Sequence, residues 1–370
     1  MNDIFLLFTP TQMLFVGLVL ILFLFITLYQ MLVYRQPVRA KNRNPKREED
    51  ELPSISVVLS VTNEYKMLRR LLPTLLTQDY PCYEVVVVND RSEDNSEILL
   101  RSLQEQYPHL QARTTSTDDR FGRSPSLALG VGIRAAQYDT ILCIEANCYV
   151  KDAHWIRSMA ALYGGNTEIV LGHTTYRRCS VWKRCDLLQH ALHYMGLAAL
   201  HLPYTGVGSN LLFKKSLFYD NNGFNVRLTR DHFPLGVFIG EVAKSNNCRI
   251  CIHPSGVTHS RYKMNGNLSR IHRKMVKRSL SMSPKMTKSP MIVETTLRLL
   301  FYLSACLSMA LFYHTLELFL LFCSMLLLRF LSVFLLYRGV KKRLDDQGLA
   351  FPFLCWDVLF PFLNLYRLFR

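Results

Sequence analysis

The chain has 370 residues, of which 44 are Lys or Arg and 28 are Asp or Glu, so its formal net charge at pH 7 is +16. This length allows one sizeable folded core plus additional segments. The positive charge would suit an anionic partner, but no nucleic-acid-binding motif accompanies it, so we expect no nucleic-acid partner.

An uncharged apolar block lies near the start of the chain. Residues 13–34 read MLFVGLVLILFLFITLYQMLVY, and these residues, about 22 in number, are enough to cross the roughly 30 Å hydrocarbon core of a bilayer. The block lacks the basic residues before it and the small-residue cleavage site after it that a signal peptide needs. We therefore expect residues 1–34 to be a retained transmembrane anchor.

Residues 35–52 predict a charged, basic linker, after which the pattern becomes that of a soluble domain. The apolar runs 55–61 and 83–88 predict strands, and a later strand is expected at 138–144. Helices are predicted at 63–76, 96–106 and 128–136. Strands that alternate with helices in this way predict an α/β fold with a mostly parallel sheet, covered by helices on both faces.

Polar residues follow three of these strands. Ligands of such sheets bind beyond the carboxyl ends of the strands. The site candidates at these positions are Asn63, Glu64, Asn89, Asp90, Glu145 and Asn147. In the stretch 140–150, TILCIEANCYV, two of them are spaced i, i+2 after a buried strand. That spacing suits a metal ion held between two carboxylates, but one of the two positions is an amide here.

A second apolar block fills residues 297–337 and breaks near 313–315, which predicts two spans joined as a helical hairpin. Arg329 lies inside the second span, where a charge is costly unless it is paired or reaches the interface. We expect a buried partner or a snorkelling side chain for Arg329. The alternative is a functional charge that faces a lipid-linked substrate.

Basic residues flank the apolar blocks at 35–47, 269–278 and 338–343. All three flanks lie on one side of the membrane if the domain between the blocks is cytoplasmic. We therefore expect a multi-pass protein of the cytoplasmic (inner) membrane, with its soluble domain in the cytoplasm and its basic flanks near anionic headgroups. The last stretch, 349–370, contains two prolines and predicts an interfacial or re-entrant segment.

Two stretches of the soluble part resemble glycosyltransferases of family 2, which have the GT-A fold. They read SVVLSVTNEYKMLRRLLPTLLTQDYPCYEVVVVNDRSEDNSEILLRSL and ALGVGIRAAQYDTILCIEANCYVKDAHWIRSM, within a similarity that covers residues 54–280. The anchor and the C-terminal hairpin also resemble membrane-bound bacterial members of the family. The resemblance implies a GT-A domain at 53–290, a membrane hairpin at 297–337, and a basic loop with an interfacial segment at 338–370.

The resemblance implies a nucleotide-sugar donor and names the residues that would bind it. Asn63 and Glu64 match the N-E after the first strand, where the loop meets the base. Asp90 matches the nucleotide-binding carboxylate. Arg123 is the only cation near the position at which the family has a lysine.

The chain departs from the family where the chemistry should occur. Glu145 and Asn147 stand in place of the D-x-D that holds Mg²⁺ or Mn²⁺ on the diphosphate. One charge in place of two weakens such a site by about 2 kcal/mol at an effective dielectric near 20, so a divalent cation is expected to bind weakly or not at all. The family's base cluster is missing, and the closest carboxylate is Asp231, with His232 beside it. Losing a general base costs roughly 10²–10⁴-fold in rate.

Two hypotheses follow from this pattern. In the first, the protein is an inverting glycosyltransferase with a weak metal site, Asp231 or His232 as its base, and a membrane-associated glycan or lipid-linked acceptor. In the second, it is a pseudo-glycosyltransferase that acts as scaffold or regulator of an active protein partner. Single residues have structural alternatives: Asp90 could cap the following loop, Glu145 could pair with Arg123, and the segment of Asp231 could be a solvated loop.

Overall fold

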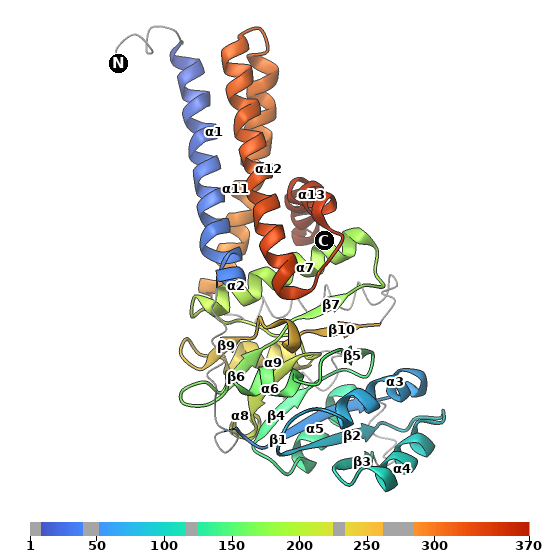
Figure 1. Ribbon diagram of the computed structural model, residues 1–370. Helices are drawn as coiled ribbons and strands as arrows, with labels where there is room; N and C mark the ends of the chain where they lie inside the picture. Colours follow the sequence, from blue (N-terminus) through green and yellow to red (C-terminus); the bar gives the residue numbers. More distant parts are fainter. Residues whose placement is uncertain (1–8, 40–51, 116–123, 225–233, 262–284, 370) are drawn as a thin grey trace.

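The computed structural model describes residues 9–39, 52–115, 124–224, 234–261 and 285–369. The predicted site residues Arg123, Asp231 and His232 lie outside these ranges. Figure 1 shows an α/β domain at one end of the molecule and a bundle of long helices at the other, with helix α7 lying across the base of the bundle.

The larger of the two sheets in the described chain has seven strands in the order β3-β2-β1-β4-β8-β6-β9. Its strands are β1 (Ile55–Val61), β2 (Tyr83–Asn89), β3 (Leu110–Thr114), β4 (Thr140–Cys143), β6 (Ile169–Leu171), β8 (Leu211–Lys214) and β9 (Cys248–Ile250). Four neighbouring pairs are parallel, and β8 runs antiparallel to both β4 and β6. The predicted, mostly parallel sheet is therefore confirmed.

Strand β1 shows why this sheet needs helices on both faces. Its alternate residues Ile55, Val57 and Leu59 pack into one hydrophobic core, and Val58 packs into the other. The helices of the domain are α3 (Tyr65–Leu76), α4 (Ser96–Gln106), α5 (Pro125–Ala135), α6 (Trp155–Ala160), α7 (Val181–Ala199), α8 (Lys215–Asp220) and α9 (Pro234–Val242), with the short turn η4 (Pro254–Gly256). Helices α3 and α6 cover one face, and α5, α7 and α9 cover the other.

Two helices begin at residues other than those predicted. Helix α3 starts at Tyr65, two residues late, because Asn63 has a φ of 55° and so cannot be helical. Helix α5 starts early, at Pro125, because the Ser124 side chain accepts a hydrogen bond from the Leu127 N–H and caps the helix.

A smaller sheet, β5-β10-β7, lies next to the larger sheet on the side toward α7 (Figure 1). Its strands are β5 (Cys148–Val150), β7 (Thr174–Tyr176) and β10 (Thr258–Ser260). Strand β10 pairs antiparallel with β5 and parallel with β7, so Ser260 lies opposite Cys148 on one side and Tyr176 on the other. This sheet begins directly after Glu145 and Asn147, and its first strand fixes where these two residues lie.

Three helices of the described chain are long and apolar enough to cross a membrane. The first candidate span, Pro10–Tyr34, consists of α1 (Pro10–Tyr29) and the π-helical turn η2 (Gln30–Tyr34), and the short helix α2 (Gln36–Arg39) follows. The other two lie in α11 (Lys285–Leu311) and α12 (Leu316–Leu344). Helix α13 (Ala350–Phe369), in the stretch predicted to be interfacial or re-entrant, is a single helix that continues through Pro361.

Buried charges join the helices of the bundle. Arg329 is 1% exposed and forms an ion pair with Asp357 of α13, so the expectation of a buried partner is confirmed. Arg298 of α11 forms ion pairs with Glu294 and with Asp357. The Tyr34 hydroxyl donates to Glu294 over 2.5 Å. In this way two arginines and two carboxylates compensate one another within the bundle.

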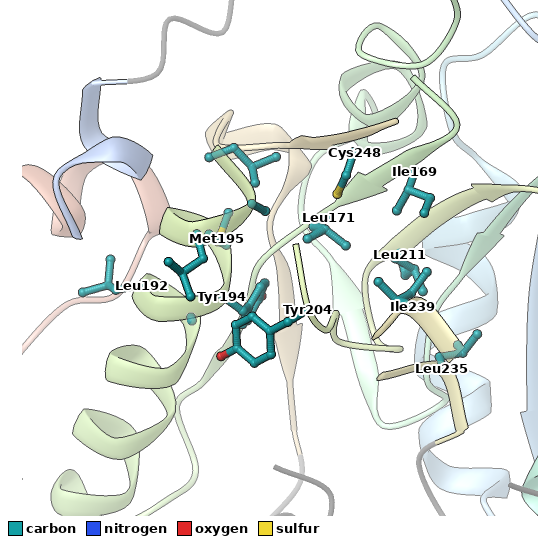
Figure 2. Close-up of a cluster of buried hydrophobic side chains, with 14 of the residues drawn as sticks. Ile169, Leu171, Leu192, Tyr194, Met195, Tyr204, Leu211, Leu235, Ile239 and Cys248 are labelled. Carbon is teal, nitrogen blue, oxygen red and sulfur yellow. The ribbon is translucent and has the colours of Figure 1, made fainter. Parts of the chain in front are cut away.

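Helix α7 connects the bundle to the domain. Gln189 on α7 donates to the Tyr34 hydroxyl over 2.7 Å, which links α7 to the first span. On its other side α7 packs into the larger core, where Figure 2 shows Tyr194 and Met195 beside Leu171 and Tyr204. The soluble domain is therefore fixed to the bundle through a helix that is buried between them.

Candidate functional site

The carboxyl ends of three adjacent parallel strands bring most of the predicted site residues to one edge of the sheet. Strand β1 leads to Asn63 and Glu64, β2 leads to Asp90, and β4 leads to Glu145. Because parallel strands end on the same edge, residues distant in the sequence meet there.

Asn63 holds two of the loops at this edge together. Its backbone N–H donates to the Ser92 hydroxyl over 2.9 Å, and its side-chain oxygen accepts from the Glu93 N–H over 2.7 Å. The Tyr65 N–H donates to the Asp94 carboxylate over 2.8 Å. The loops after β1 and β2 are therefore held together by three hydrogen bonds.

The Asp90 carboxylate is buried, and each of its oxygens accepts one hydrogen bond from the protein. Oδ1 accepts from the Thr115 hydroxyl over 2.9 Å, and Oδ2 accepts from the Ser124 N–H over 3.0 Å. Arg91 Nε lies 3.6 Å from Oδ1. Asp90 thus ties the end of β2 to the start of α5, and each oxygen keeps a lone pair for a further donor.

Glu145 and Asn147 lie side by side after β4. Asn147 Nδ2 donates to Glu145 Oε2 over 3.0 Å. The amide oxygen of Asn147 accepts from the Ser260 hydroxyl over 3.1 Å and from the Cys148 thiol over 3.2 Å. The amide therefore presents its N–H to Glu145 and turns its oxygen away from it.

Electrostatics connects Glu64 to Glu145. Burial, followed by the charges of Glu145 and Asp94, raises the pKa of Glu64 to about 7. Burial also raises the pKa of Glu145, and the hydrogen bond from Asn147 acts against that rise. At neutral pH the two carboxyls therefore carry less than two negative charges.

Three residues near Glu145 were not predicted from the sequence. Burial, and then the charge of Glu145, raises the pKa of the Cys148 thiol and of the Tyr176 hydroxyl, and the nearby Ser209 side chain acts against the rise in each pKa. Ser209 belongs to the YTGVGSN stretch at 204–210 and could have been found there. Nothing in the sequence marks Tyr176, because it reaches Glu145 only through the pairing of β7 with β10.

The fit of a divalent cation depends on the oxygens that face one another. In the ranges that the structure describes, no group of three or more His, Cys, Asp or Glu side chains could hold a metal ion. Asn147 gives its N–H, and not its oxygen, to Glu145. As it stands, the pair does not offer two oxygen ligands to one ion.

Asn210, in the same stretch as Ser209, has a structural role. Its side chain is fully buried, and it accepts from Trp155 Nε1 over 3.2 Å and donates to the carbonyls of His173 and Gly256 over 2.8 and 2.7 Å. Trp155 and Tyr204 are buried as well, so they pack in the core and are not free to stack on a ligand.

Comparisons with known proteins agree with this architecture. Residues 56–221 match the model of glycosyl transferase family 2. A stretch of 109 residues, 30% of this chain, is 29% identical to poly-beta-1,6-N-acetyl-D-glucosamine synthase of Staphylococcus aureus (strain COL). The corresponding synthase of Staphylococcus epidermidis is 26% identical over 107 residues, 29% of this chain. Each match spans only 25% of the relative's own length.

The fold is similar to that of a mannosyltransferase from Pyrobaculum calidifontis, solved in complex with GDP-Man and Mn²⁺. The TM-score is 0.56 at 16% sequence identity, and the similarity covers 95% of this chain and 99% of that chain. The predicted GT-A fold is therefore confirmed.

Proposed function

Because residues 56–221 form a glycosyl transferase family 2 domain, we propose that the protein transfers a sugar from a nucleotide-sugar donor to an acceptor at the membrane, with inversion at the anomeric carbon. The observation that supports this proposal is the placement of Glu64 and Glu145, whose charges interact, after β1 and β4 at the edge of the sheet where ligands of such sheets bind.

The donor's diphosphate would lie against Glu145, and its nucleoside would lie between Asn63, Glu64 and Asp90. Two full negative charges beside a diphosphate would repel it. Partial protonation of Glu64 lowers that repulsion, whereas the hydrogen bond from Asn147 favours the charged form of Glu145. On this proposal the site would accept a diphosphate with little or no help from Mg²⁺ or Mn²⁺.

The remaining roles fall to residues outside the described ranges. Arg123 would neutralise the diphosphate in place of the family's lysine. Asp231 or His232 would take the proton from the acceptor hydroxyl as its oxygen attacks the anomeric carbon. The bond between that carbon and the phosphate oxygen breaks, and the nucleoside diphosphate leaves.

The acceptor would be a glycan or a lipid-linked molecule at the membrane surface. Three candidate spans support a multi-pass protein of the cytoplasmic membrane. The last turn of α12 contains Lys341, Lys342 and Arg343, and this basic end lies on the same side as the domain (Figure 1). By the positive-inside rule the domain would face the cytoplasm.

One observation favours a second candidate function, that of a pseudo-glycosyltransferase which regulates or supports an active partner protein. Asp90 and Asn147 accept hydrogen bonds from other parts of the protein, and such bonds are typical of residues with a structural role. On this alternative the domain could still bind a nucleotide, but it would not transfer a sugar.

Calorimetric titration of the detergent-solubilised, full-length protein with UDP and with GDP, each with and without Mn²⁺, tests the proposal. We expect binding of one nucleotide that Asp90→Ala weakens and that Mn²⁺ strengthens only slightly. Glu97→Gln, at a partly exposed position on α4, is the matched control and should bind as the wild type does.

Sugar transfer must be measured separately, with membranes as the acceptor source and a labelled donor of the nucleotide that binds. Transfer that is lost in Asp231→Asn or His232→Gln supports the enzyme. Nucleotide binding without transfer to any membrane fraction favours the regulatory alternative. Absence of binding by both nucleotides contradicts the donor site proposed here.

A further inference from the structure

The segment that joins β7 to α7 exposes two arginines next to two apolar side chains. We name it the β7–α7 corner, and it consists of Arg177, Arg178, Val181 and Trp182. Both arginines are exposed, while Val181 is 41% and Trp182 is 48% exposed. Most of the later residues of α7 are buried, so the helix is exposed mainly at this end. A tryptophan with half its surface in water is costly unless something covers it.

An ion pair places this corner at the end of a candidate membrane span. Arg177 Nη2 donates to Asp345 Oδ2 over 3.0 Å. Asp345 is the residue at which α12 ends, and the last turn of α12 is basic. Because these charges avoid the hydrocarbon core, the end of α12 lies outside that core, on the headgroup side of the span. The corner lies at the same level.

A second contact leads from the corner to another exposed aromatic residue. Arg184, two residues after Trp182, donates to Asp346 over 2.8 Å and to the Gln347 carbonyl over 2.6 Å. Phe351 follows in the first turn of α13 and is 74% exposed. The contact of Arg184 with Asp346 and Gln347 is therefore flanked in the sequence by two exposed aromatic residues, Trp182 before Arg184 and Phe351 after Gln347.

Positive charge is in excess at the corner. Asp345 accepts from Lys151 over 2.6 Å as well as from Arg177, so two cations share one carboxylate. Arg178 adds a third positive charge. The excess suits an anion, and the planar guanidinium group is well matched to phosphate.

We propose that the β7–α7 corner docks on the phosphate headgroups of anionic lipids in the bilayer that the chain's own helices span. The arginines would bind the phosphates, and Trp182 would lie at the interface between headgroups and acyl chains, where tryptophan is enriched in membrane proteins. This lipid contact would lie next to the end of α12, where that helix leaves the membrane. It would fix the tilt of the domain, and thus of the Glu145 edge of the sheet, relative to the membrane.

Tryptophan fluorescence of the full-length protein in lipid nanodiscs tests this proposal. The chain has three tryptophans, and Trp155 and Trp356 are 0% and 3% exposed. Discs would contain phosphatidylglycerol and a lipid with a nitroxide on its headgroup. We expect quenching in the wild type that is lost in Trp182→Phe, and that weakens in Arg178→Gln or when phosphatidylcholine replaces phosphatidylglycerol.

Matched controls come from α4, far from the bundle in Figure 1. Ile98 is 69% exposed, so the double variant Ile98→Trp with Trp182→Phe keeps three tryptophans and should not be quenched. Arg101→Gln removes an exposed charge and should leave the quenching unchanged. Equal quenching of wild type and Trp182→Phe would overturn the proposal, because Trp182 would then lie in water. Quenching that is the same with phosphatidylcholine as with phosphatidylglycerol, and the same in Arg178→Gln as in the wild type, would overturn the role of the phosphates.

Discussion

Arg329 of α12 and Asp357 of α13 form a two-point ion pair inside the helical bundle. Arg329 Nε donates to Asp357 Oδ2 over 2.9 Å, and Nη2 donates to Oδ1 over 2.7 Å. The Tyr302 hydroxyl donates to the same carboxylate over 2.5 Å. A residue that the sequence presents as an isolated charge in an apolar span is thus the link between three helices.

Removal of this carboxylate should destabilise the bundle. Asp357→Ala leaves Arg329 buried without its main partner, and breaking a buried pair in this way costs about 3–5 kcal/mol. The midpoint of thermal unfolding in detergent should therefore fall clearly. Glu317→Gln is the matched control, because Glu317 is an exposed carboxylate on α12, the helix of Arg329, and its loss should cost little. Equal stability of the two variants would contradict the role of the pair.

Asn210 should be required for the stability of the domain. Asn210→Ala removes three buried hydrogen bonds and leaves the Trp155 N–H and two carbonyls without that partner. The expected loss is roughly 1–3 kcal/mol in the free energy of unfolding, measured by chemical denaturation in detergent. Asn221→Ala, at an exposed position with one hydrogen bond, should stay within about 0.5 kcal/mol of the wild type.

Cation binding should increase when the missing carboxylate is restored. Asn147→Asp places a second charge beside Glu145, and we expect the affinity for Mn²⁺ to rise by about 2 kcal/mol, which is roughly 30-fold. Titration of the nucleotide-bound protein with Mn²⁺ measures this change. Asn147→Ala removes the amide without adding a charge and should not strengthen binding. If both variants bind Mn²⁺ alike, the cation does not use this position.

The affinity for a nucleoside diphosphate should fall as the pH rises from 6 to 8. Glu64 has a raised pKa of about 7, so it is mostly neutral below that value and mostly charged above it. The added charge should cost at least about 1 kcal/mol, a roughly fivefold loss of affinity. Glu64→Gln should keep the high affinity and flatten the dependence on pH. A wild-type profile identical to that of Glu64→Gln would exclude Glu64 from the donor site.

The same titration affects stability with a defined sign. In the unfolded chain Glu64 releases its proton near its ordinary pKa of 4.5, whereas the folded protein keeps that proton until about pH 7. The folded state therefore binds more protons in this interval, and the contribution of Glu64 to stability falls as the pH rises through it. Glu64→Gln should remove this part of the pH dependence of unfolding.

Local patterns in the sequence were sufficient for the first half of the α/β domain. The runs at 55–61 and 83–88 are rich in β-branched and other apolar residues, and they became central strands buried on both faces. Helix α4 has the predicted bounds, because the helical spacing of its apolar residues starts and ends where the helix does. The three spans could also be located, since length and hydropathy determine which segments can cross a bilayer.

The sequence by itself determined which side chains stand at the ends of the strands, because the pattern of strands and helices fixes that order along the chain. Only the tertiary structure decided what those side chains do. It turned the amide oxygen of Asn147 toward Ser260, which is 113 residues away, and paired Arg329 with Asp357. Hydrogen bonds and buried charges act over a few ångströms in space, whatever the distance in sequence, so such partners can be identified only after the chain has folded.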